Sequence, residues 1–184
     1  MDIEYFLRKE DILVNQLYLA SNSALINQRR FFNRVLPSFS ALFIGTFLYF
    51  QAGGRQGALF LFWFSTFSIL WFILIPFYQR WAYKMRYAKT VEDGYRDSGE
   101  KRIKLRLREK EIKISDSSNS SAILLKELES ITESAGYFFI KSKKGNSLVI
   151  PKERCIGNNL EKFIEMVENV SGIKREKKLH WKWK

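Results

Sequence analysis

The fold of this chain is decided by two apolar runs, LPSFSALFIGTFLYFQA (residues 36–52) and GALFLFWFSTFSILWFILIPFY (residues 57–78). No Asp, Glu, Lys or Arg interrupts either run. Each has close to the ~20 residues with which an α-helix crosses the roughly 30 Å hydrocarbon core of a bilayer. Residues 53–56 alone separate the runs, which predicts antiparallel helices joined by a tight turn. We therefore expect a transmembrane hairpin with both ends on one side of the membrane.

Two other interpretations of these runs are a helical hairpin buried in a soluble core and a cleaved signal peptide. Two adjacent runs of this length disfavour the buried hairpin. The polar residues 1–34 precede the first run, and no small-residue cleavage pattern follows a short apolar region, which disfavours the signal peptide. Both spans are therefore expected to remain in the protein.

The orientation of the hairpin follows from the Lys and Arg residues near its ends. Arg55 alone lies in the connecting turn. Seven basic residues lie near the other ends of the two runs: Arg29, Arg30, Arg34, Arg80, Lys84, Arg86 and Lys89. The positive-inside rule then predicts a protein of the cytoplasmic (inner) membrane with two spans and with both termini in the cytoplasm. No ionisable residue lies within a span, which disfavours a transporter or pump.

Composition excludes several further classes. The 184 residues contain 31 Lys and Arg against 19 Asp and Glu, a net charge of +12, with one His and one Cys. One Cys cannot form an internal disulfide, and one Cys with one His cannot supply a zinc site without several carboxylates. We therefore expect no metal site and no cofactor.

The rest of the chain divides by pattern into a cytoplasmic part before and after the hairpin. Ile3, Tyr5 and Leu7 predict a short strand, and Asp11 is placed to cap a following amphipathic helix that a polar stretch at residues 21–23 interrupts. The expected segments are 1–34 (short strand and amphipathic helix), 35–80 (hairpin), 81–100 (juxtamembrane helix and linker, the linker from Thr90), 101–172 (cytoplasmic domain) and 173–184 (basic tail).

The cytoplasmic domain is predicted to contain antiparallel strands followed by one helix. Apolar and polar residues alternate over residues 103–107 and 112–114, and further apolar runs follow around polar turns up to Pro151. Asn158 or Asn159 then caps a helix with an apolar face of Leu160, Phe163, Ile164 and Val167. The fold class is α+β: a two-helix transmembrane hairpin and a small antiparallel β-roll or partly open barrel closed by a C-terminal helix.

Two stretches of the sequence resemble a known family. Ile3-Glu4-Tyr5-Phe6-Leu7 is followed by Glu10-Asp11, and Leu148-Val149-Ile150-Pro151-Lys152 is followed by the helix containing Phe163. With the order of elements, they make the sequence resemble the bacterial YcxB-like membrane proteins over nearly its whole length. The resemblance implies a cytoplasmic domain like a pleckstrin-homology (PH) fold, with the hairpin inserted after its first strand. Leu125 and Cys155 stand where the family usually has aromatic residues, and the family brings no catalytic residue with it.

Two basic segments are candidates for contact with an anion or a lipid headgroup. One is the turn with Lys141, Lys143 and Lys144, for which a solvated hairpin tip is the alternative. The other is the tail, whose candidate residues are Lys174, Arg175, Lys177, Lys178, Trp181 and Trp183. Basic residues and Trp suit the surface of an anionic leaflet, and a membrane tether favours lipid over nucleic acid for the same residues. A disordered, solubilising tail is the alternative.

Three other features are candidates for chemistry. Cys155 beside Lys152 and Arg154 is either a reactive thiol or a small packing residue, and the second interpretation is favoured. His180 has no partner in the sequence, and the carboxylates Glu127, Glu129 and Glu133 are more typical of a solvated strand face than of acid–base catalysis.

The sequence thus predicts a non-enzymatic membrane-anchored adaptor or sensor whose cytoplasmic domain binds a protein, a peptide or a lipid headgroup. The alternative is a self-assembling protein that organises the membrane as a homo-oligomer through its hairpin and basic surface. An enzyme would need a cluster of ionisable groups, and the sequence indicates none.

Overall fold

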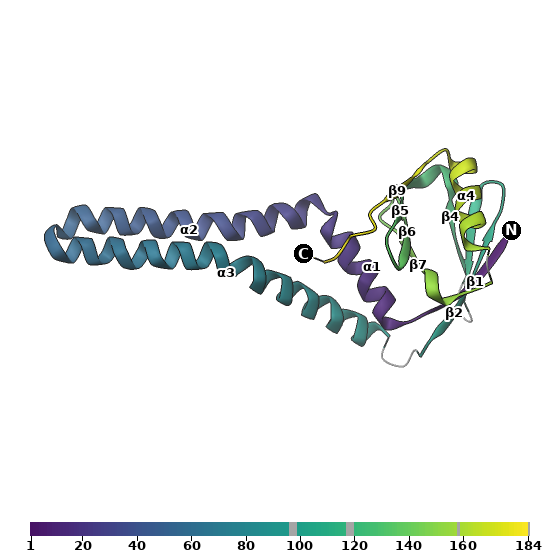
Figure 1. Cartoon of the computed structure of the whole chain (residues 1–184), viewed down its shortest axis with the longest axis horizontal. Coiled ribbons are helices and arrows are strands. Elements are labelled where there is room, and N and C mark those ends of the chain that lie inside the picture. Colours follow the sequence, from purple (N-terminus) through teal and green to yellow (C-terminus); the bar gives the residue numbers. More distant parts are fainter. Residues whose placement is uncertain (96–98, 117–119, 158, 184) are drawn as a thin grey trace. The chain divides into compact units, whose positions relative to one another are not determined.

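The computed structural model describes residues 1–95, 99–116, 120–157 and 159–183, and it confirms the α+β class (Figure 1). The helices are α1 (Lys9–Ser21), α2 (Ala24–Ala52), α3 (Gly54–Gly94) and α4 (Leu160–Ser171), with short 3₁₀ helices η1 (Leu125–Glu127) and η2 (Lys152–Arg154). The strands are β1 (Asp2–Leu7), β2 (Lys101–Leu107), β3 (Glu111–Ser115), β4 (Ser120–Leu124), β5 (Leu128–Glu133), β6 (Tyr137–Ser142), β7 (Ser147–Pro151), β8 (Cys155–Ile156) and β9 (Arg175–Lys177). The chain divides into two compact units: a sheet domain (residues 1–19 and 87–183) and a helical hairpin (residues 20–86).

The first sheet of the sheet domain has the strand order β4-β3-β2-β1-β8 and is antiparallel throughout. Strand β1 pairs with β2 along its whole length, from Asp2 opposite Arg106 to Leu7 opposite Lys101. The short N-terminal strand therefore belongs to the same sheet as the later strands. In chain order, the whole hairpin is inserted between two strands that are hydrogen-bonded neighbours.

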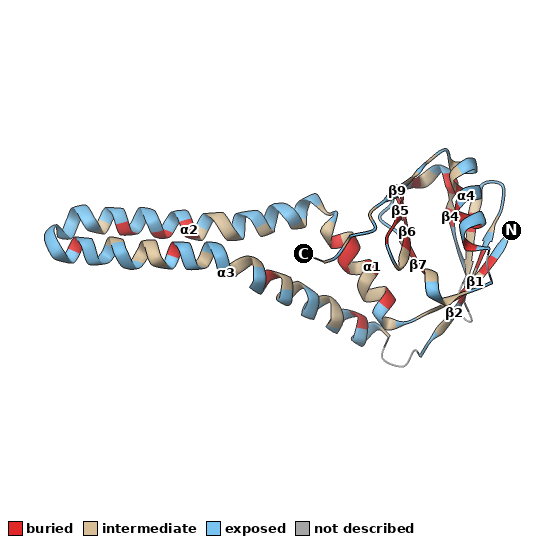
Figure 2. Ribbon diagram, viewed as in Figure 1, coloured by how far each residue is buried: buried red, intermediate tan, exposed pale blue. Residues whose placement is uncertain are grey.

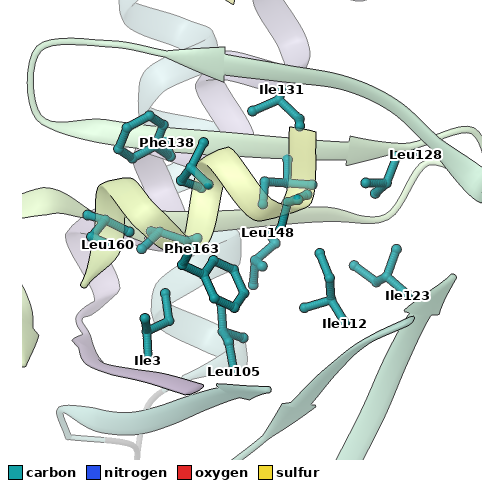
Figure 3. Packing of buried hydrophobic residues seen from close by; sticks show 14 of the residues in the cluster. Ile3, Leu105, Ile112, Ile123, Leu128, Ile131, Phe138, Leu148, Leu160 and Phe163 are labelled. Atoms are coloured by element: carbon teal, nitrogen blue, oxygen red, sulfur yellow. The ribbon is translucent and has the colours of Figure 1, made fainter. Parts of the chain in front are cut away.

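The second sheet has the order β7-β6-β5-β9, in which β9 alone runs parallel to its neighbour. The inward faces of both sheets and one face of α4 form a single apolar core (Figure 3). The predicted apolar face of α4 is confirmed, because Leu160, Phe163, Ile164 and Val167 are all buried. Burying a side chain such as Phe163 stabilises the fold by about 1.5–3 kcal/mol.

Several predicted boundaries differ from the observed ones. Ser21 ends α1, and the polar break contains Ser23, whose Oγ accepts the Ile26 N–H to begin α2. The first predicted span (36–52) is therefore the C-terminal part of one long helix, and Pro37 lies inside that helix rather than in a first turn. The four-residue turn shortens to Gly53 alone, whose positive φ of 61° suits glycine.

The predicted linker and turns differ in the same way. Helix α3 continues to Gly94, where a linker was expected from Thr90, because Val91 is buried and extends the packed part of the helix. The other expected linker residues 96–98, the turn residues 117–119 and Asn158 lie outside the described residues. Asn159 occupies the N-cap position of α4, but its side chain makes no capping hydrogen bond. The expected tail contributes β9 to the second sheet.

Candidate functional site

The interface between α2 and α3 is built from small residues at coiled-coil spacing. On α2 the buried positions are Ser38, Ala41 and Gly45, and on α3 the corresponding buried positions include Gly57 and Ser68. Alternating steps of three and four residues keep one narrow face of each helix toward the other. Small residues at such positions let two backbones approach closely, which is a common way to pack helices in membranes.

Two contacts show how close this approach is. A Cβ atom built on Gly45 would lie 2.6 Å from the Cβ of Phe64 on the facing helix, so no larger residue fits there. Further along the interface, Ser68 Oγ donates to the carbonyl oxygen of Ser38 at 2.8 Å, and Ser38 Oγ donates to the carbonyl oxygen of Ser68 at 3.3 Å. The hairpin register is therefore fixed by both shape and hydrogen bonding.

Each helix of the hairpin contains a proline, and each proline frees a carbonyl group that the other helix satisfies. Proline has no N–H, so Pro37 leaves the carbonyl of Asn33 without its helical donor, and Pro76 does the same to Phe72. The indole N–H of Trp71 donates to the Asn33 oxygen at 3.2 Å. On the other helix, Arg34 Nε donates to the Phe72 oxygen at 3.0 Å. Satisfied carbonyls of this kind are what make proline tolerable in membrane helices.

The outward surface of the hairpin consists of large apolar side chains. Only 17% and 6% of the most apolar 18-residue windows of α2 and α3 are buried, and Figure 2 shows the hairpin mostly as exposed. The exposed aromatic side chains include Phe43 at 75%, Phe50 at 77% and Trp63 at 63%. Both helices are thus long and apolar enough to cross a membrane, and few of the residues in their most apolar windows are buried.

A cavity of about 380 Å³ opens between α2 and α3 near the ends of the hairpin opposite its turn. Its lining residues are Arg29, Asn33, Tyr78, Gln79, Ala82, Tyr83 and Arg86. We call it the foot cavity. Every polar group in this lining has at least one N–H or O–H that can donate a hydrogen bond, and two of the groups are guanidinium cations. The donor set suits an anion, and it contains no carboxylate.

Two of the three lysines at the basic turn between β6 and β7 pair with nearby glutamates. Lys141 Nζ lies 2.8 Å from Glu129 Oε1, and Lys144 Nζ lies 2.8 Å from Glu127 Oε1. Lys143 Nζ donates to the carbonyl oxygen of Lys126 at 3.4 Å. The sequence showed the three lysines as one run, and the strand pairing brings two glutamates to them.

The predicted tail is folded onto the sheet domain rather than separate from it. Arg175 is the anchor: its guanidinium lies within 4.0 Å of Glu133, Glu161, Glu165 and Glu168, and its side chain is 15% exposed. Its backbone N–H also donates to Glu168 Oε1 at 2.5 Å. The hydrogen bonds that the guanidinium donates to Glu161 and Glu168 raise its pKa further above the ordinary value. Arg175 therefore holds β9 against α4.

The other tail residues occupy different environments. Trp181 packs edge-on against Tyr18 and Phe139, with ring centroids 5.5 Å and 5.7 Å away. Lys178 Nζ pairs with Glu176 at 3.1 Å. Lys174 and Lys177 are exposed, and Trp183 is half-buried. Since β9 and the β6–β7 turn lie at different edges of the second sheet, the two predicted basic segments do not form one patch.

The candidates for chemistry, Cys155, His180 and the three glutamates, are found in the following surroundings. Burial raises the pKa of the Cys155 thiol to about 11, and its Sγ donates to the Pro151 carbonyl oxygen at 3.5 Å. A thiol in that state is mostly protonated, which suits a packing residue. His180 is exposed. Lys152 donates to Glu133 at 2.7 Å and thereby lowers the pKa of that carboxyl. Each of the three glutamates Glu127, Glu129 and Glu133 thus pairs with a different lysine.

A buried carboxylate, Asp11, connects α1 to the second sheet. The helix begins at Lys9, so Asp11 lies in its first turn and not before it as the sequence predicted. From there its Oδ2 accepts the Arg8 N–H at 2.8 Å, which caps the start of α1. The same oxygen pairs with Arg154 NH1 at 2.5 Å, and Oδ1 accepts the Tyr137 hydroxyl at 3.1 Å. Burial, together with Asp11, raises the pKa of Tyr137. Tyr137 and Arg154 are more than 120 positions from Asp11 in the sequence, and no sequence pattern links them to it.

Among the residues that the structure describes, no group of three or more His, Cys, Asp and Glu side chains is placed to hold a metal ion. Compared with known proteins, the chain matches no protein-family model and no curated sequence.

Proposed function

We propose that this chain is a YcxB-like integral membrane protein of the cytoplasmic membrane, and that it is a non-enzymatic adaptor or sensor. Its hairpin anchors a PH-like binding domain at the cytoplasmic surface. The observation that carries the proposal is the insertion of two exposed apolar helices between the neighbouring strands β1 and β2.

The exposed surface of the hairpin supports a membrane location. A soluble monomer rarely exposes a contiguous apolar patch larger than about 300–600 Å². Here large apolar side chains remain exposed along both helices, so water is a poor solvent for the hairpin. The proline-freed carbonyls, satisfied between the helices, and the close contact at Gly45 are features of helix pairs in lipid.

The strand pairing supports a single location for the whole sheet domain. Since β1 precedes the hairpin and β2 follows it, both ends of the hairpin must leave the membrane on the same side. The excess of Lys and Arg at those ends favours the cytoplasm.

The order of elements supports the PH-like assignment and a binding role. Eight strands in two sheets precede α4, whose apolar face is buried in their common core, and the hairpin follows the first strand as the family resemblance implies. The three glutamates considered as catalytic are occupied in ion pairs, and burial keeps the Cys155 thiol protonated. A domain of this kind acts by holding a partner near the membrane.

Topology can be tested with single cysteines, because Cys155 is the only cysteine of the chain. In a Cys155→Ser background, Gly53→Cys reports on the turn and Lys110→Cys reports on the sheet domain. In intact cells, a membrane-impermeant maleimide should label position 53 and leave position 110 unlabelled until the cells are opened. Release of the protein by alkaline carbonate, or the opposite labelling pattern, would refute the proposal.

The adaptor role needs a partner, and a pull-down from native membranes in mild detergent should retain one at fixed stoichiometry. Retention should be saturable, and it should weaken when Arg175→Met destabilises the sheet domain. A large homo-oligomer with no retained partner would refute the adaptor role and favour the self-assembling alternative.

A further inference from the structure

The edges of the two sheets differ in how well they are protected, and we propose that β4 pairs with the β4 strand of a second copy of this chain. The strand order leaves β4 and β8 at the edges of the first sheet, and β7 and β9 at the edges of the second. Edge strands carry unpaired N–H and C=O groups, which proteins normally protect with charged side chains, proline or short strands. The proposed adaptor role assigns nothing to β4.

Three of the four edges carry such a protection. Strand β8 has only two residues, and all three residues of β9 are charged. Strand β7 ends at Pro151, which has no N–H to donate. Strand β4 (SSAIL) has five residues without a charge or a proline, and Ser120, Ser121 and Ala122 are exposed. Strand β4 is therefore the edge that is open to another strand.

The hydrogen bonds between β3 and β4 show which backbone groups of β4 face the free edge. The Leu125 N–H donates to the Lys110 carbonyl oxygen at 2.9 Å, and this pair continues the register of the two strands. Because bonded and non-bonded pairs alternate in an antiparallel ladder, the N–H and C=O groups of Ser120 and Ala122 point away from β3. In the part of the chain that the structure describes, no backbone hydrogen bond joins these two residues to a residue outside the sheet.

A second β4 strand completes this edge residue by residue. When Ala122 lies opposite Ala122 of the second copy, a twofold axis relates the two strands, and every residue from Ser120 to Leu124 has a partner. The two Ala122 residues then form a hydrogen-bonded pair, in which the N–H of each donates to the carbonyl oxygen of the other. Such a contact uses the same surface on both copies and leaves neither β4 edge free. The expected assembly is a closed dimer.

The absence of charge on β4 suits pairing with an identical strand. Like charges directly opposite each other destabilise a strand pair, and two β4 strands bring none. Lys113 lies opposite Ala122 on β3, one strand away from the free edge. The two copies of Lys113 would be three strand spacings apart, about 14 Å, which exceeds the Debye length of about 8 Å at physiological salt. The net charge of +12 is thus kept away from the contact.

A membrane anchor makes so small a contact effective, and this step rests on the proposed function. One strand pair has few hydrogen bonds, each with a net contribution of about 0.5–1.5 kcal/mol, and stable complexes in solution bury about 1,200–2,000 Å². Copies anchored in one bilayer are confined to a thin layer beside it, which raises their effective concentration. A soluble peptide lacks this advantage, so a second copy is the occupant that we infer.

Single cysteines on β4 test both the contact and its register. In a Cys155→Ser background, Ala122→Cys places two thiols across the axis with Cα atoms about 5.5 Å apart, within the range of a disulfide. Ser120→Cys is the matched control, because it is also exposed and lies on the same face of β4. Its two copies are four residues out of register and about 14 Å apart. The full-length protein is oxidised in its native membranes with copper phenanthroline and run on non-reducing gels.

The disulfide-linked dimer of Ala122→Cys should form at least about tenfold faster than that of Ser120→Cys, because only the first pair of thiols is within reach. Ser120→Cys co-expressed with Leu124→Cys should cross-link as fast as Ala122→Cys, since the register places these two residues opposite each other. Equal rates for the two single variants, which random collisions would give, would overturn the proposal. So would the absence of an Ala122→Cys dimer.

An added charge tests the contact without a thiol on β4. Copies that carry a donor or an acceptor dye on Lys110→Cys, in the Cys155→Ser background, are mixed at low density in lipid vesicles. Ala122→Lys should reduce energy transfer between copies at least about fivefold, since its two ammonium groups meet at the axis, whereas Ser120→Lys should reduce it no more than about twofold. Equal losses in the two variants would overturn the proposal.

Folding, insertion and the other occupant give distinguishable results. Ala122→Lys should keep the protease resistance of the wild type, because position 122 is exposed and its N–H does not bond to β3; if it does not, the cysteine comparison still decides. A protein that resists alkaline carbonate but forms no cross-link at position 122 refutes this inference alone, whereas release by carbonate refutes the proposed function. A monomeric chain that retains a segment of another protein, and loses it in Ala122→Lys, would overturn self-pairing.

Discussion

The indole of Trp71 should stabilise the hairpin only because Pro37 has freed the carbonyl that the indole binds. Trp71→Phe removes the donor and keeps an aromatic ring, which leaves the Asn33 oxygen without a partner. An unsatisfied buried polar group costs about 1–3 kcal/mol, and hydrogen bonds between membrane helices average about 0.6 kcal/mol with a maximum near 1.7. We therefore expect a loss of about 0.5–2 kcal/mol.

The same substitution should be nearly harmless once the proline is gone. Pro37→Ala restores the backbone N–H at position 37, which donates to the Asn33 oxygen as in any helix. The carbonyl is then satisfied with or without the indole. The coupling energy between the two substitutions should thus account for nearly the whole effect of Trp71→Phe, while changes in ring packing cancel in the cycle.

Helix separation can be followed by energy transfer between dyes on Gln28→Cys and Lys84→Cys in a Cys155→Ser background. Increasing the mole fraction of SDS in mixed micelles unfolds the hairpin, and the midpoints of four variants complete the cycle. An equal cost of Trp71→Phe in the proline and alanine backgrounds would show that the indole does not bind this carbonyl. Arg34→Gln with Pro76→Ala gives the mirror-image cycle, with a larger expected coupling because the donor is charged.

Four further outcomes follow from the contacts. Gly45→Leu should destabilise the hairpin by about 1–3 kcal/mol in the same SDS titration, because its Cβ would lie 2.6 Å from Phe64, and an unchanged midpoint would contradict the close packing. Arg175→Met should destabilise the sheet domain by about 2–4 kcal/mol in pulse proteolysis with urea, because it leaves carboxylates of α4 without their cation. Resistance equal to that of the wild type would contradict the role of Arg175 in holding β9 against α4. The lowered pKa of Glu133 adds stability that is present above its unfolded pKa near 4.3 and is lost as pH falls through the folded value. Glu133→Gln should therefore flatten the acid limb of a curve of stability against pH, and parallel curves for the two proteins would contradict this. Alkylation of Cys155 should be slow at pH 7 and accelerate as pH approaches 11, since its pKa is about 11, whereas rapid labelling at pH 7 would contradict its burial.

Local pattern predicted the elements of this protein well. Charge-free runs predicted both long helices, alternation predicted β2 and β3, and the spacing of Leu160, Phe163, Ile164 and Val167 predicted the buried face of α4. Each of these signals depends on residues a few positions apart. The end of the first span at Ala52 was predicted correctly, but α2 begins at Ala24, well before that span, and α3 continues to Gly94, well beyond the second, because a helix can continue past the apolar residues that cross the membrane.

Partnerships between distant residues could not be predicted in the same way. The lysines of the β6–β7 turn form a run in the sequence, but Glu127 and Glu129 reach them only through the pairing of β5 with β6. The foot cavity depends on the register between α2 and α3, which the reciprocal bonds of Ser38 and Ser68 set. Charge counts near the spans indicated Arg29 and Arg86 separately, and only the hairpin register placed them in one cavity.

The insertion of the hairpin between β1 and β2 links membrane insertion to completion of the sheet domain. Strand β1 is made first, but its partners β2 and β8 are made only after the whole hairpin. An unstructured connection of that length would oppose the pairing through its loop-closure entropy. A hairpin that has already folded in the bilayer returns the chain to its starting side and removes much of that entropy. The sheet domain should therefore complete its first sheet after the hairpin has folded, and a chain whose hairpin does not fold should also lack a finished first sheet.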